Sequence, residues 1–468
     1  MSSNHPSSGN QSKLTNKPST ARKVNFGYTR QIVFLAIPAI VAAQIDNLVG
    51  LIDIFMVGKL GAEAVSAVGI SRVIIMVISI MMISVSTGAF AMVAQFIGAR
   101  SPVEASATAK QSITLMIILS VVMSSVGIFS ARWSLQALSL APEVVELATP
   151  YLQVFYGGMV FMAVNYCVTN FFYAAGDMRT PLVINSVISV VKIGASYLLI
   201  FGELGFPALG VTGAAVGTIL GRLCGVILGL SILYSGRFRV TLLRETSYWL
   251  DRALARRILR IGIPSALQGL FRNGSGVVFV KLVALTDAST AALAAFSIGN
   301  QVERVLRRTS LAFGTAATCM VGQSIGEGKL DIAESKGITT IIIASGSMIL
   351  MSMGIALMGH SLMEIFTDVD AVIRIGIVYI YAMAIAEPFM SLAAVSVGGL
   401  RGAGETRSAL YYTIICQWFI RLPVGYLLAF PLGFGINGLW ASLVVFSVLQ
   451  GLLSFRRFLS GAWKKIQV

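Results

Sequence analysis

The stretch QIVFLAIPAIVAAQIDNLVGLIDIFMVG, residues 31–58, is apolar throughout except for a few amides and two acidic residues, Asp46 and Asp53. As a helix it is long enough to cross the hydrocarbon core of a bilayer, which is about 30 Å thick. A carboxylate at the centre of such a helix costs about 2.5–3.5 kcal/mol. Seven residues complete about two helical turns, so both carboxylates lie on one face. The stretch therefore predicts a membrane-spanning helix whose acidic face meets another polar group.

The composition extends this prediction to the whole chain. Hydrophobic residues make up 56% of the sequence and charged residues only 12%, against about 25% charged in soluble domains, and the mean hydropathy is +0.83. We expect an all-α polytopic membrane protein with twelve transmembrane helices. The apolar segments lie at 31–57, 68–97, 108–130, 147–174, 180–201, 208–234, 257–285, 290–320, 337–359, 372–399, 408–430 and 434–458.

The basic residues predict the orientation in the membrane. Lys and Arg are frequent before the first span and in every second loop, most densely at 237–260, whereas the intervening loops are mainly acidic. Because basic loops stay in the cytoplasm, both termini should be cytoplasmic, and the protein should lie in the cell inner (plasma) membrane. The net charge of +15 resides largely in these loops and in the C-terminal tail. Membrane lipids are therefore the expected partners, and nucleic acid is not.

Three pairs of similar segments reveal an internal repeat. AIPAIVAAQIDN (36–47) resembles GIPSALQGLFRN (262–273), AQFIGARSPVEASATAKQSIT (94–114) resembles GQSIGEGKLDIAESKGITT (322–340), and AAGDMRTP (174–181) resembles GAGETRSA (402–409). The separation is close to half the chain and covers six spans. This predicts two six-helix lobes related by a pseudo-two-fold axis along the membrane normal, a construction found in secondary transporters.

The repeat and the charge pattern together divide the chain. The N-terminal tail lacks an apolar core of the kind found in signal peptides and is rich in polar residues, so it should be disordered and cytoplasmic. The predicted parts are the tail 1–30, an N-lobe 31–234, a basic cytoplasmic linker 235–256, a C-lobe 257–458 and a cytoplasmic tail 459–468.

The order of several short motifs resembles one transporter family. A proline in the first helix is followed by DIFMVGKLGAEAVSAVGIS (53–71), QFIGAR (95–100), GDMRTP (176–181) and YLLIFG (197–202), and the second half has GQSIGEGK (322–329) and LRGAGETR (400–407). This pattern is similar to that of the multidrug and toxic compound extrusion (MATE) transporters over residues 31–458. The resemblance implies two six-helix lobes around a central cleft. It also implies export of mostly cationic, amphipathic compounds in exchange for Na⁺ or H⁺.

The resemblance also assigns the coupling residues. Asp53 stands fifteen residues after Pro38, where the family has the aspartate that binds the coupling ion. Lys192 and Ser196 occupy positions where many members have an Asn and an Asp, and Arg272 replaces a glutamate found in some members. Hard cations need oxygen ligands, so these replacements favour H⁺ over Na⁺. We expect Lys192 to lie near Asp53 as a tethered cation, and the cation-coupling set is Asp53, Asp46, Lys192 and Ser196.

Polar residues inside other predicted spans are candidates for substrate binding or gating. The span at 290–320 contains NQVERVLRRTS, in which Glu303 and Arg307 are neighbours one turn apart. Its arginines either belong to a paired network with Glu387 or form an electropositive pocket. The full candidate set is Gln44, Asn47, Asn165, Asn170, Arg272, Asn300, Glu303, Arg307 and Glu387.

The repeat leaves two pairings open for the charged residues of the first helix in each lobe. Asp46 and Arg272 each stand eight residues after a proline, so they should lie at similar depth and could form a pair across the cleft that breaks in one transport state. The alternative is pairing within each lobe, Asp46 with Lys192 and Arg272 with Glu303 or Glu387.

Two motif matches carry no chemistry. GQSIG (322–326) fits a nucleophile elbow but follows an apolar helix, and the only histidines are His5 and His360, so a serine hydrolase is excluded. IGEGKL lacks the upstream glycine and the Ser or Thr of a phosphate-binding loop. The four cysteines show no metal-ligand spacing. We expect no enzyme, no cofactor and no metal site.

The sequence thus predicts a secondary active antiporter that exports amphipathic, mainly cationic compounds in exchange for protons, less favourably Na⁺, by alternating access. It should act as a monomer on small-molecule substrates. The alternative is a flippase or exporter of anionic amphiphiles, such as lipid-linked saccharides, that uses a basic cavity in the C-lobe. A scaffold that transports nothing is disfavoured by the many charges inside predicted spans.

Overall fold

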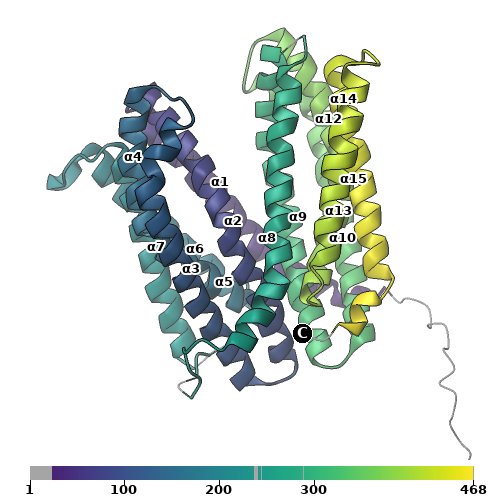
Figure 1. Ribbon diagram of the computed structural model, residues 1–468. Helices are drawn as coiled ribbons and strands as arrows, with labels where there is room; N and C mark the ends of the chain where they lie inside the picture. Colours follow the sequence, from purple (N-terminus) through teal and green to yellow (C-terminus); the bar gives the residue numbers. More distant parts are fainter. Residues whose placement is uncertain (1–23, 237–240, 244, 288, 467–468) are drawn as a thin grey trace, which may run out of the picture.

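The computed structural model describes residues 24–236, 241–243, 245–287 and 289–466. The chain forms two helical bundles side by side, the N-lobe from α1 to α7 and the C-lobe from α8 to α15 (Figure 1). The segment that joins the lobes lies at one end of the molecule, called here the linker end. From there the two lobes diverge towards the opposite end (Figure 1).

Most helices of both lobes are long, and the shorter ones follow one another along the chain. The N-lobe consists of α1 (Thr29–Gly58), α2 (Ala62–Gly98), α3 (Pro102–Gln136), α4 (Pro142–Gly157), α5 (Met159–Ala175), α6 (Arg179–Phe201) and α7 (Val211–Tyr234). The C-lobe consists of α8 (Arg252–Ala284), α9 (Ser289–Gly326), α10 (Leu330–Leu357), α11 (Gly359–Glu364), α12 (Asp370–Gly402), α13 (Arg407–Ile414), the π-helix η3 (Ile415–Arg421), α14 (Leu422–Ala429) and α15 (Gly435–Leu459).

The number of membrane crossings agrees with the sequence. Nine helices within the described residues are long and apolar enough to span a membrane, or ten when α4 and α5, bent by 50° at Gly158, count as one span. The helices α8 and α9 have 33 and 38 residues but carry more charge than an isolated span tolerates. With them the bundle has twelve spans, six in each lobe, and the predicted fold class is confirmed.

Several helices extend beyond their predicted apolar segments. The predicted span 108–130 lies inside α3, which begins with Pro102 in its first turn, where the missing N–H of proline has no helical partner to lose. The linker in the structure is shorter than the predicted one, 235–256, because α8 already begins at Arg252. Asp251 caps this helix, and its Oδ1 accepts a hydrogen bond from the amide of Ala253 at 2.8 Å.

The predicted tails also differ from the structure where it describes them. Helix α1 begins at Thr29, within the predicted tail 1–30, and residues 1–23 of that tail lie outside the described residues. At the C-terminal end of the chain, α15 ends at Leu459 and is followed by a 3₁₀ turn, Ala462–Lys465. The predicted disorder of the N-terminal tail stays a prediction.

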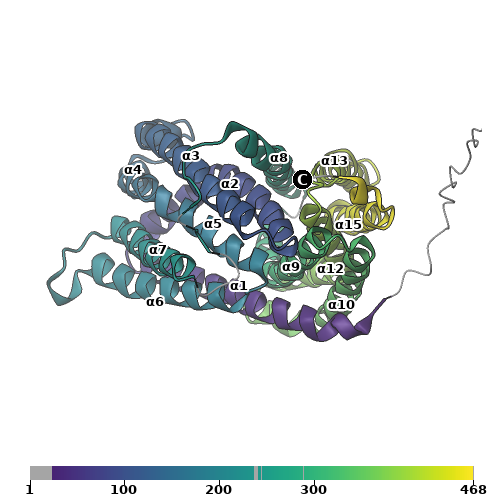
Figure 2. The ribbon, with the colours of Figure 1, turned by 90° about the horizontal axis from the view of Figure 1, so that it is seen from below.

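The lobes touch at the linker end, where α2 packs against α8 and α9 (Figure 2). Two glycines permit this approach. A Cβ atom on Gly98 would lie 2.0 Å from the carbonyl oxygen of Gln323, and one on Gly326 would lie 1.9 Å from that of Gln95. Any side chain at either position would push the lobes apart, so glycine sets how closely the two backbones can approach.

Hydrogen bonds at the same place follow the predicted pseudo-two-fold relation. The side-chain amide of Gln95 in α2 donates through Nε2 to the backbone carbonyl of Gly402, at the end of α12, at 2.9 Å. The side-chain amide of Gln323 in α9 donates through Nε2 to the backbone carbonyl of Ala174, at the end of α5, at 2.7 Å. The two donors are 228 residues apart, and so are the two acceptors. Each lobe therefore makes the same contact to the other.

Candidate functional site

A buried carboxylate lies between two cations in the N-lobe. Asp53 in α1 is 6% exposed, and its Oδ2 accepts hydrogen bonds from Lys192 Nζ in α6 and from Arg72 Nη2 in α2, the latter at 3.2 Å. Its other oxygen, Oδ1, is buried and has no hydrogen-bond partner among the described residues. The predicted proximity of Lys192 to Asp53 is confirmed, and three helices meet at this ion cluster.

A further basic residue, Arg222, lies in the interior of the same lobe. Arg222 in α7 donates to Oδ1 of Asn165 in α5 at 3.1 Å, and Asn165 is 2% exposed. Ser196 is fully buried, and its hydroxyl makes no hydrogen bond within the described part of the chain. The interior of the N-lobe thus holds the cations Arg72, Lys192 and Arg222 around the single carboxylate of Asp53.

Asp46 takes no part in this cluster. Its side chain is exposed, and the described residues include no ion pair to it. The expected pairing of Asp46 with Lys192 is wrong in this conformation, because Lys192 bonds Asp53 instead. The cross-cleft pair with Arg272 is also not formed.

The remaining polar candidates of the N-lobe lie near the opposite lobe or within their own. Gln44 crosses between lobes, since its Nε2 donates to the carbonyl of Val305 in α9 at 3.3 Å. Asn47 supports it by donating to Gln44 Oε1 at 2.9 Å. Asn170 in α5 donates to the hydroxyl of Ser86 in α2 and stays inside its lobe. Gln44 is therefore the candidate that the structure places at the junction of the lobes.

The predicted ion pair in the C-lobe is present. Arg307 Nη1 and Glu303 Oε1 are 2.8 Å apart, one turn from each other on α9. The hydroxyl of Tyr379 in α12 donates to the other oxygen of Glu303 at 2.5 Å. Both oxygens of Glu303 are therefore occupied, and the expected pairing of Glu303 with Arg272 is wrong in this conformation.

Glu387 and Arg272 form no ion pair among the described residues. Glu387 in α12 is 3% exposed, and its Oε2 makes no hydrogen bond within the described residues. Arg272 in α8 has no carboxylate within 4 Å among those residues, so the expected pair Arg272–Glu387 is not formed. Asn300 is half-buried, and no hydrogen bond involves its side chain in the described part of the chain.

Two cavities adjoin at α9. One lies inside the C-lobe, has a volume of about 70 Å³ and is lined by polar and charged side chains that include Gln268, Arg272, Arg307, Glu387, Arg401 and Gln417. The other lies between the lobes, has a volume of about 390 Å³ and is lined by Ala39, Ala43 and Tyr173 from one lobe and by Arg304, Arg307, Arg308 and Leu311 from the other. Arg307 and Leu311 belong to both cavities.

A family model described as MatE matches residues 38–198 and 264–427, one match in each lobe. The chain belongs to the MatE family. It is 27% identical to the uncharacterized transporter YisQ of Bacillus subtilis over 95% of this chain and 97% of the relative. It is also 27% identical to the probable multidrug resistance protein NorM of Thermotoga maritima over 93% of both chains. A solved structure titled as the outward-facing conformation of a multidrug resistance MATE family transporter superposes with a TM-score of 0.86, at 23% identity, over 93% of this chain and 96% of the other.

As a MatE protein the chain is a multi-pass membrane transporter and not an enzyme. Four residues in the two polar interiors were not among the candidates predicted from the sequence. They are Arg72 and Arg222 in the N-lobe and Gln268 and Arg401 in the C-lobe. Arg72 and Arg222 lie within apolar spans, and the cost of a charge in lipid was the signal that could have identified them. Arg401 lies just beyond the predicted span 372–399, so the cost of a charge in lipid gave no signal there.

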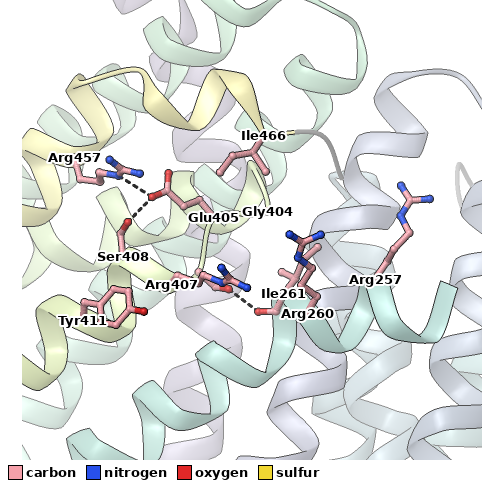
Figure 3. Close-up of a pocket in the computed structure, with 11 residues that line it drawn as sticks. Arg257, Arg260, Ile261, Gly404, Glu405, Arg407, Ser408, Tyr411, Arg457 and Ile466 are labelled. Atoms are coloured by element: carbon pink, nitrogen blue, oxygen red, sulfur yellow. Dashed lines mark hydrogen bonds and ion pairs between the residues drawn. The ribbon is translucent and has the colours of Figure 1, made fainter. Parts of the chain in front are cut away.

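A further cavity of this MatE protein lies at the linker end, away from both polar interiors. It has a volume of about 820 Å³, and Arg257, Arg260 and Arg407 line it without a carboxylate within 4 Å among the described residues (Figure 3). Arg457 Nε and Glu405 Oε1 are 2.7 Å apart on its wall. The pocket therefore carries an excess of positive charge at the linker end.

Proposed function

We propose that this MatE protein is a secondary active transporter of the plasma membrane that exports organic compounds in exchange for protons. The observation that carries the proposal is the ion cluster of the N-lobe, in which Asp53 is buried between Lys192 and Arg72. Charged groups inside membrane spans are costly and are retained for function. Relatives named as multidrug resistance proteins support export.

The cluster favours a proton as the coupling ion. A sodium ion needs several oxygen ligands, but Asp53 Oδ2 already accepts from both Lys192 and Arg72. Protonation of Asp53 would remove the charge that holds these two cations. The helices α1, α2 and α6 would then favour a different arrangement, and a proton could bias the equilibrium between two states. One chain contains the whole cluster and both cavities, so a monomer suffices.

The charge of the loops supports an orientation with the linker end in the cytoplasm. Arg252, Arg256, Arg257 and Arg260 lie at that end on α8, as the positive-inside rule requires. The lobes are in contact there and diverge at the opposite end (Figure 1). The conformation is then the outward-open one, from which substrate leaves and a proton enters.

Transport in reconstituted vesicles tests the proposal. Proteoliposomes loaded with a fluorescent amphipathic compound and given an imposed proton gradient should show protein-dependent movement of that compound. A protonophore should abolish this movement, and replacement of Na⁺ by K⁺ should leave it unchanged. Movement that persists after the proton gradient is collapsed, with Na⁺ present, would exclude proton coupling.

The charges of the cavities favour the second candidate for the substrate, an anionic amphiphile. Arg304, Arg307 and Arg308 line the cavity between the lobes, and the C-lobe cavity adds Arg272 and Arg401. The resemblance to the family led us to expect mainly cationic compounds, but a cation would meet like charges here. The transport assay therefore needs probes of both signs.

A further inference from the structure

We propose that the two adjoining cavities form one binding site for an anionic amphiphile, in which Arg272 and Arg401 hold a carboxylate, sulfonate or phosphate group and the apolar body lies between the lobes. The role of this site in export rests on the proposed function. Binding itself does not, and the two can be tested separately.

The first observation is that the two arginines lack anionic partners. Arg272 has no carboxylate within 4 Å, and its side chain makes no hydrogen bond among the described residues. Arg401 donates one hydrogen bond, from Nη2 to Gln268 Oε1 at 2.8 Å, while its Nε is buried and has no acceptor there. A buried donor without an acceptor, such as Arg401 Nε, is costly, whereas the exposed Arg272 side chain keeps its donors free for a ligand. A carboxylate or phosphate satisfies such donors in pairs.

Two other arginines of the same chain show how the fold itself can pair a guanidinium with a carboxylate. Arg307 is paired with Glu303 at 2.8 Å, and Arg457 is paired with Glu405 at 2.7 Å. Both of these guanidinium groups are neutralised by the fold itself. Arg272 and Arg401 line a common cavity and form no ion pair among the described residues, so a ligand anion would supply the pairing that they lack.

Glu387 is the only acidic residue that lines the C-lobe cavity within the described part of the chain. With Arg307 held by Glu303, two arginines still face this one carboxyl group. Arg304 and Arg308 add positive charge in the adjoining cavity. Within the described residues Arg308 donates one hydrogen bond, to the backbone carbonyl of Ala43 at 3.2 Å. The combined site therefore keeps an excess of positive charge.

The sizes of the cavities specify an amphiphile. The C-lobe part, with a volume of about 70 Å³, is much the smaller and is lined by Arg272 and Arg401, so it suits a compact anionic group. The volume between the lobes, about 390 Å³, lies within the range of about 300–1,000 Å³ typical of ligand sites. Its wall includes apolar side chains, among them Ala39, Leu311 and Ala312. A molecule with an anionic head and an apolar body fits both parts.

Two probes with the same body and opposite charge test the site. Purified protein in a neutral detergent is titrated with 1-pyrenesulfonate and with 1-pyrenemethylammonium, and binding is measured by equilibrium dialysis against protein-free micelles. We expect the sulfonate to bind at least about tenfold more tightly than the ammonium compound, since tenfold corresponds to only about 1.4 kcal/mol. Equal or tighter binding of the ammonium compound would overturn the proposal.

Substitutions locate the site. Arg272→Gln combined with Arg401→Gln should weaken sulfonate binding about tenfold or more, while Arg374→Gln, an exposed arginine on α12, should have no effect. Arg272→Lys keeps the positive charge but not the paired donors, so it should retain only part of the binding. If the double variant does not fold, Arg272→Gln alone decides, because this side chain faces the cavity and is not buried in packing. Unchanged sulfonate affinity in a folded Arg272→Gln variant would refute the assignment.

Two further arms separate binding from transport and identify the source of the anion. Parental protein that binds the sulfonate but shows no proton-driven export would refute the proposed proton coupling and leave the anion site intact. Proton-driven export without any preference for the sulfonate in binding would keep the proposed function and refute the anion site. Displacement of the sulfonate by dioctanoyl phosphatidylglycerol would assign the site to a lipid anion, and displacement by octanesulfonate alone would assign it to a soluble one.

Discussion

Gln95 and Gln323 occupy equivalent places in the two lobes, and each donates a hydrogen bond to a backbone carbonyl of the lobe opposite, at 2.9 and 2.7 Å. Both bonds lie where the backbones of α2 and α9 are closest, at Gly98 and Gly326. The contact that closes the linker end is therefore symmetric. In an alternating-access cycle it must open as a unit, because neither bond can form when the lobes separate at that end.

The first prediction concerns this closure. Gly98→Val should shift the protein towards the conformation that is open at the linker end, because a Cβ atom there would lie 2.0 Å from a carbonyl oxygen of the other lobe. In a cysteine-free background, spin labels at Glu104→Cys and Glu327→Cys, both exposed near this contact, should report a longer distance. Gly346→Val is the matched control, since a Cβ atom at Gly346 meets nothing within 4 Å. An unchanged label distance in Gly98→Val would contradict the interpretation.

The second prediction concerns Asp53. Asp53→Asn should abolish proton-driven export while the protein remains folded, because the amide has nearly the same shape but cannot carry a proton. Export is measured in proteoliposomes and folding by thermal melting in detergent. Glu63→Gln serves as the control, an exposed carboxylate on α2 in the same lobe. Export at the parental rate in Asp53→Asn would remove this residue from the coupling mechanism.

The third prediction concerns the choice of ion. Because Lys192 and Arg72 both bond Asp53 Oδ2, only Oδ1 of this carboxylate is free in the N-lobe cluster, and one oxygen beside two cations is a poor site for Na⁺. We expect the rate of export under a fixed proton gradient to be the same in Na⁺ and K⁺ media. Lys192→Asn replaces the ammonium by an amide oxygen and removes one competing cation, so Na⁺ should alter the rate in this variant only. A requirement for Na⁺ in the parental protein would show that the cluster opens to admit the ion.

The fold was predictable because its signals are long and repeated. Twelve apolar segments, three similar segment pairs and a proline in the first helix of each lobe indicated two six-helix units, and the hydrogen bonds of Gln95 and Gln323 confirm their relation. The ends of the helices were less predictable. Helices α3 and α9 continue past their apolar segments, because polar residues outside the hydrocarbon still form helix until a glycine or a turn ends it.

The partners inside the site were only partly predictable. The pairs Asp53–Lys192 and Glu303–Arg307 were expected, the first from family positions and the second from spacing along one helix. Arg72 reaches Asp53 from a different helix, and no periodicity within one helix shows which helices are neighbours. Arg401 starts at the linker end of α12, yet its long side chain extends to Gln268. Such reach depends on side-chain conformation, which sequence spacing does not specify.

The fourth prediction concerns Asp46 and Arg272. The two side chains form no ion pair in this conformation, and Arg272 lines the C-lobe cavity. Single swaps, Asp46→Arg or Arg272→Asp, should each impair transport by altering the charge of the pathway. The double swap should recover nothing, because a pair that does not meet cannot be restored by exchange. Recovery of transport in the double swap would instead place the pair in the opposite conformation and restore the idea of a gate across the cleft.

The final prediction concerns the ion pair at the linker end. Glu405 is 5% exposed, and its Oε1 accepts from Arg457 Nε at 2.7 Å and from the hydroxyl of Ser408 (Figure 3). Removal of one partner of a buried pair leaves an uncompensated charge and typically costs about 3–5 kcal/mol. Arg457→Gln leaves the buried carboxylate without its cation. Glu405→Gln leaves Arg457, whose side chain is 34% exposed, with access to water.

The two single variants should therefore differ. We expect Arg457→Gln to lower the apparent melting temperature in detergent more than Glu405→Gln does, and the double variant to be more stable than Arg457→Gln alone. High salt should not rescue Arg457→Gln, because salt screens exposed charges far better than buried ones. If Glu405→Gln were the more harmful change, repulsion among Arg257, Arg260, Arg407 and Arg457 around the pocket would outweigh the desolvation of Glu405. In that case added salt should restore the stability of Glu405→Gln, since exposed arginines repel one another through solvent.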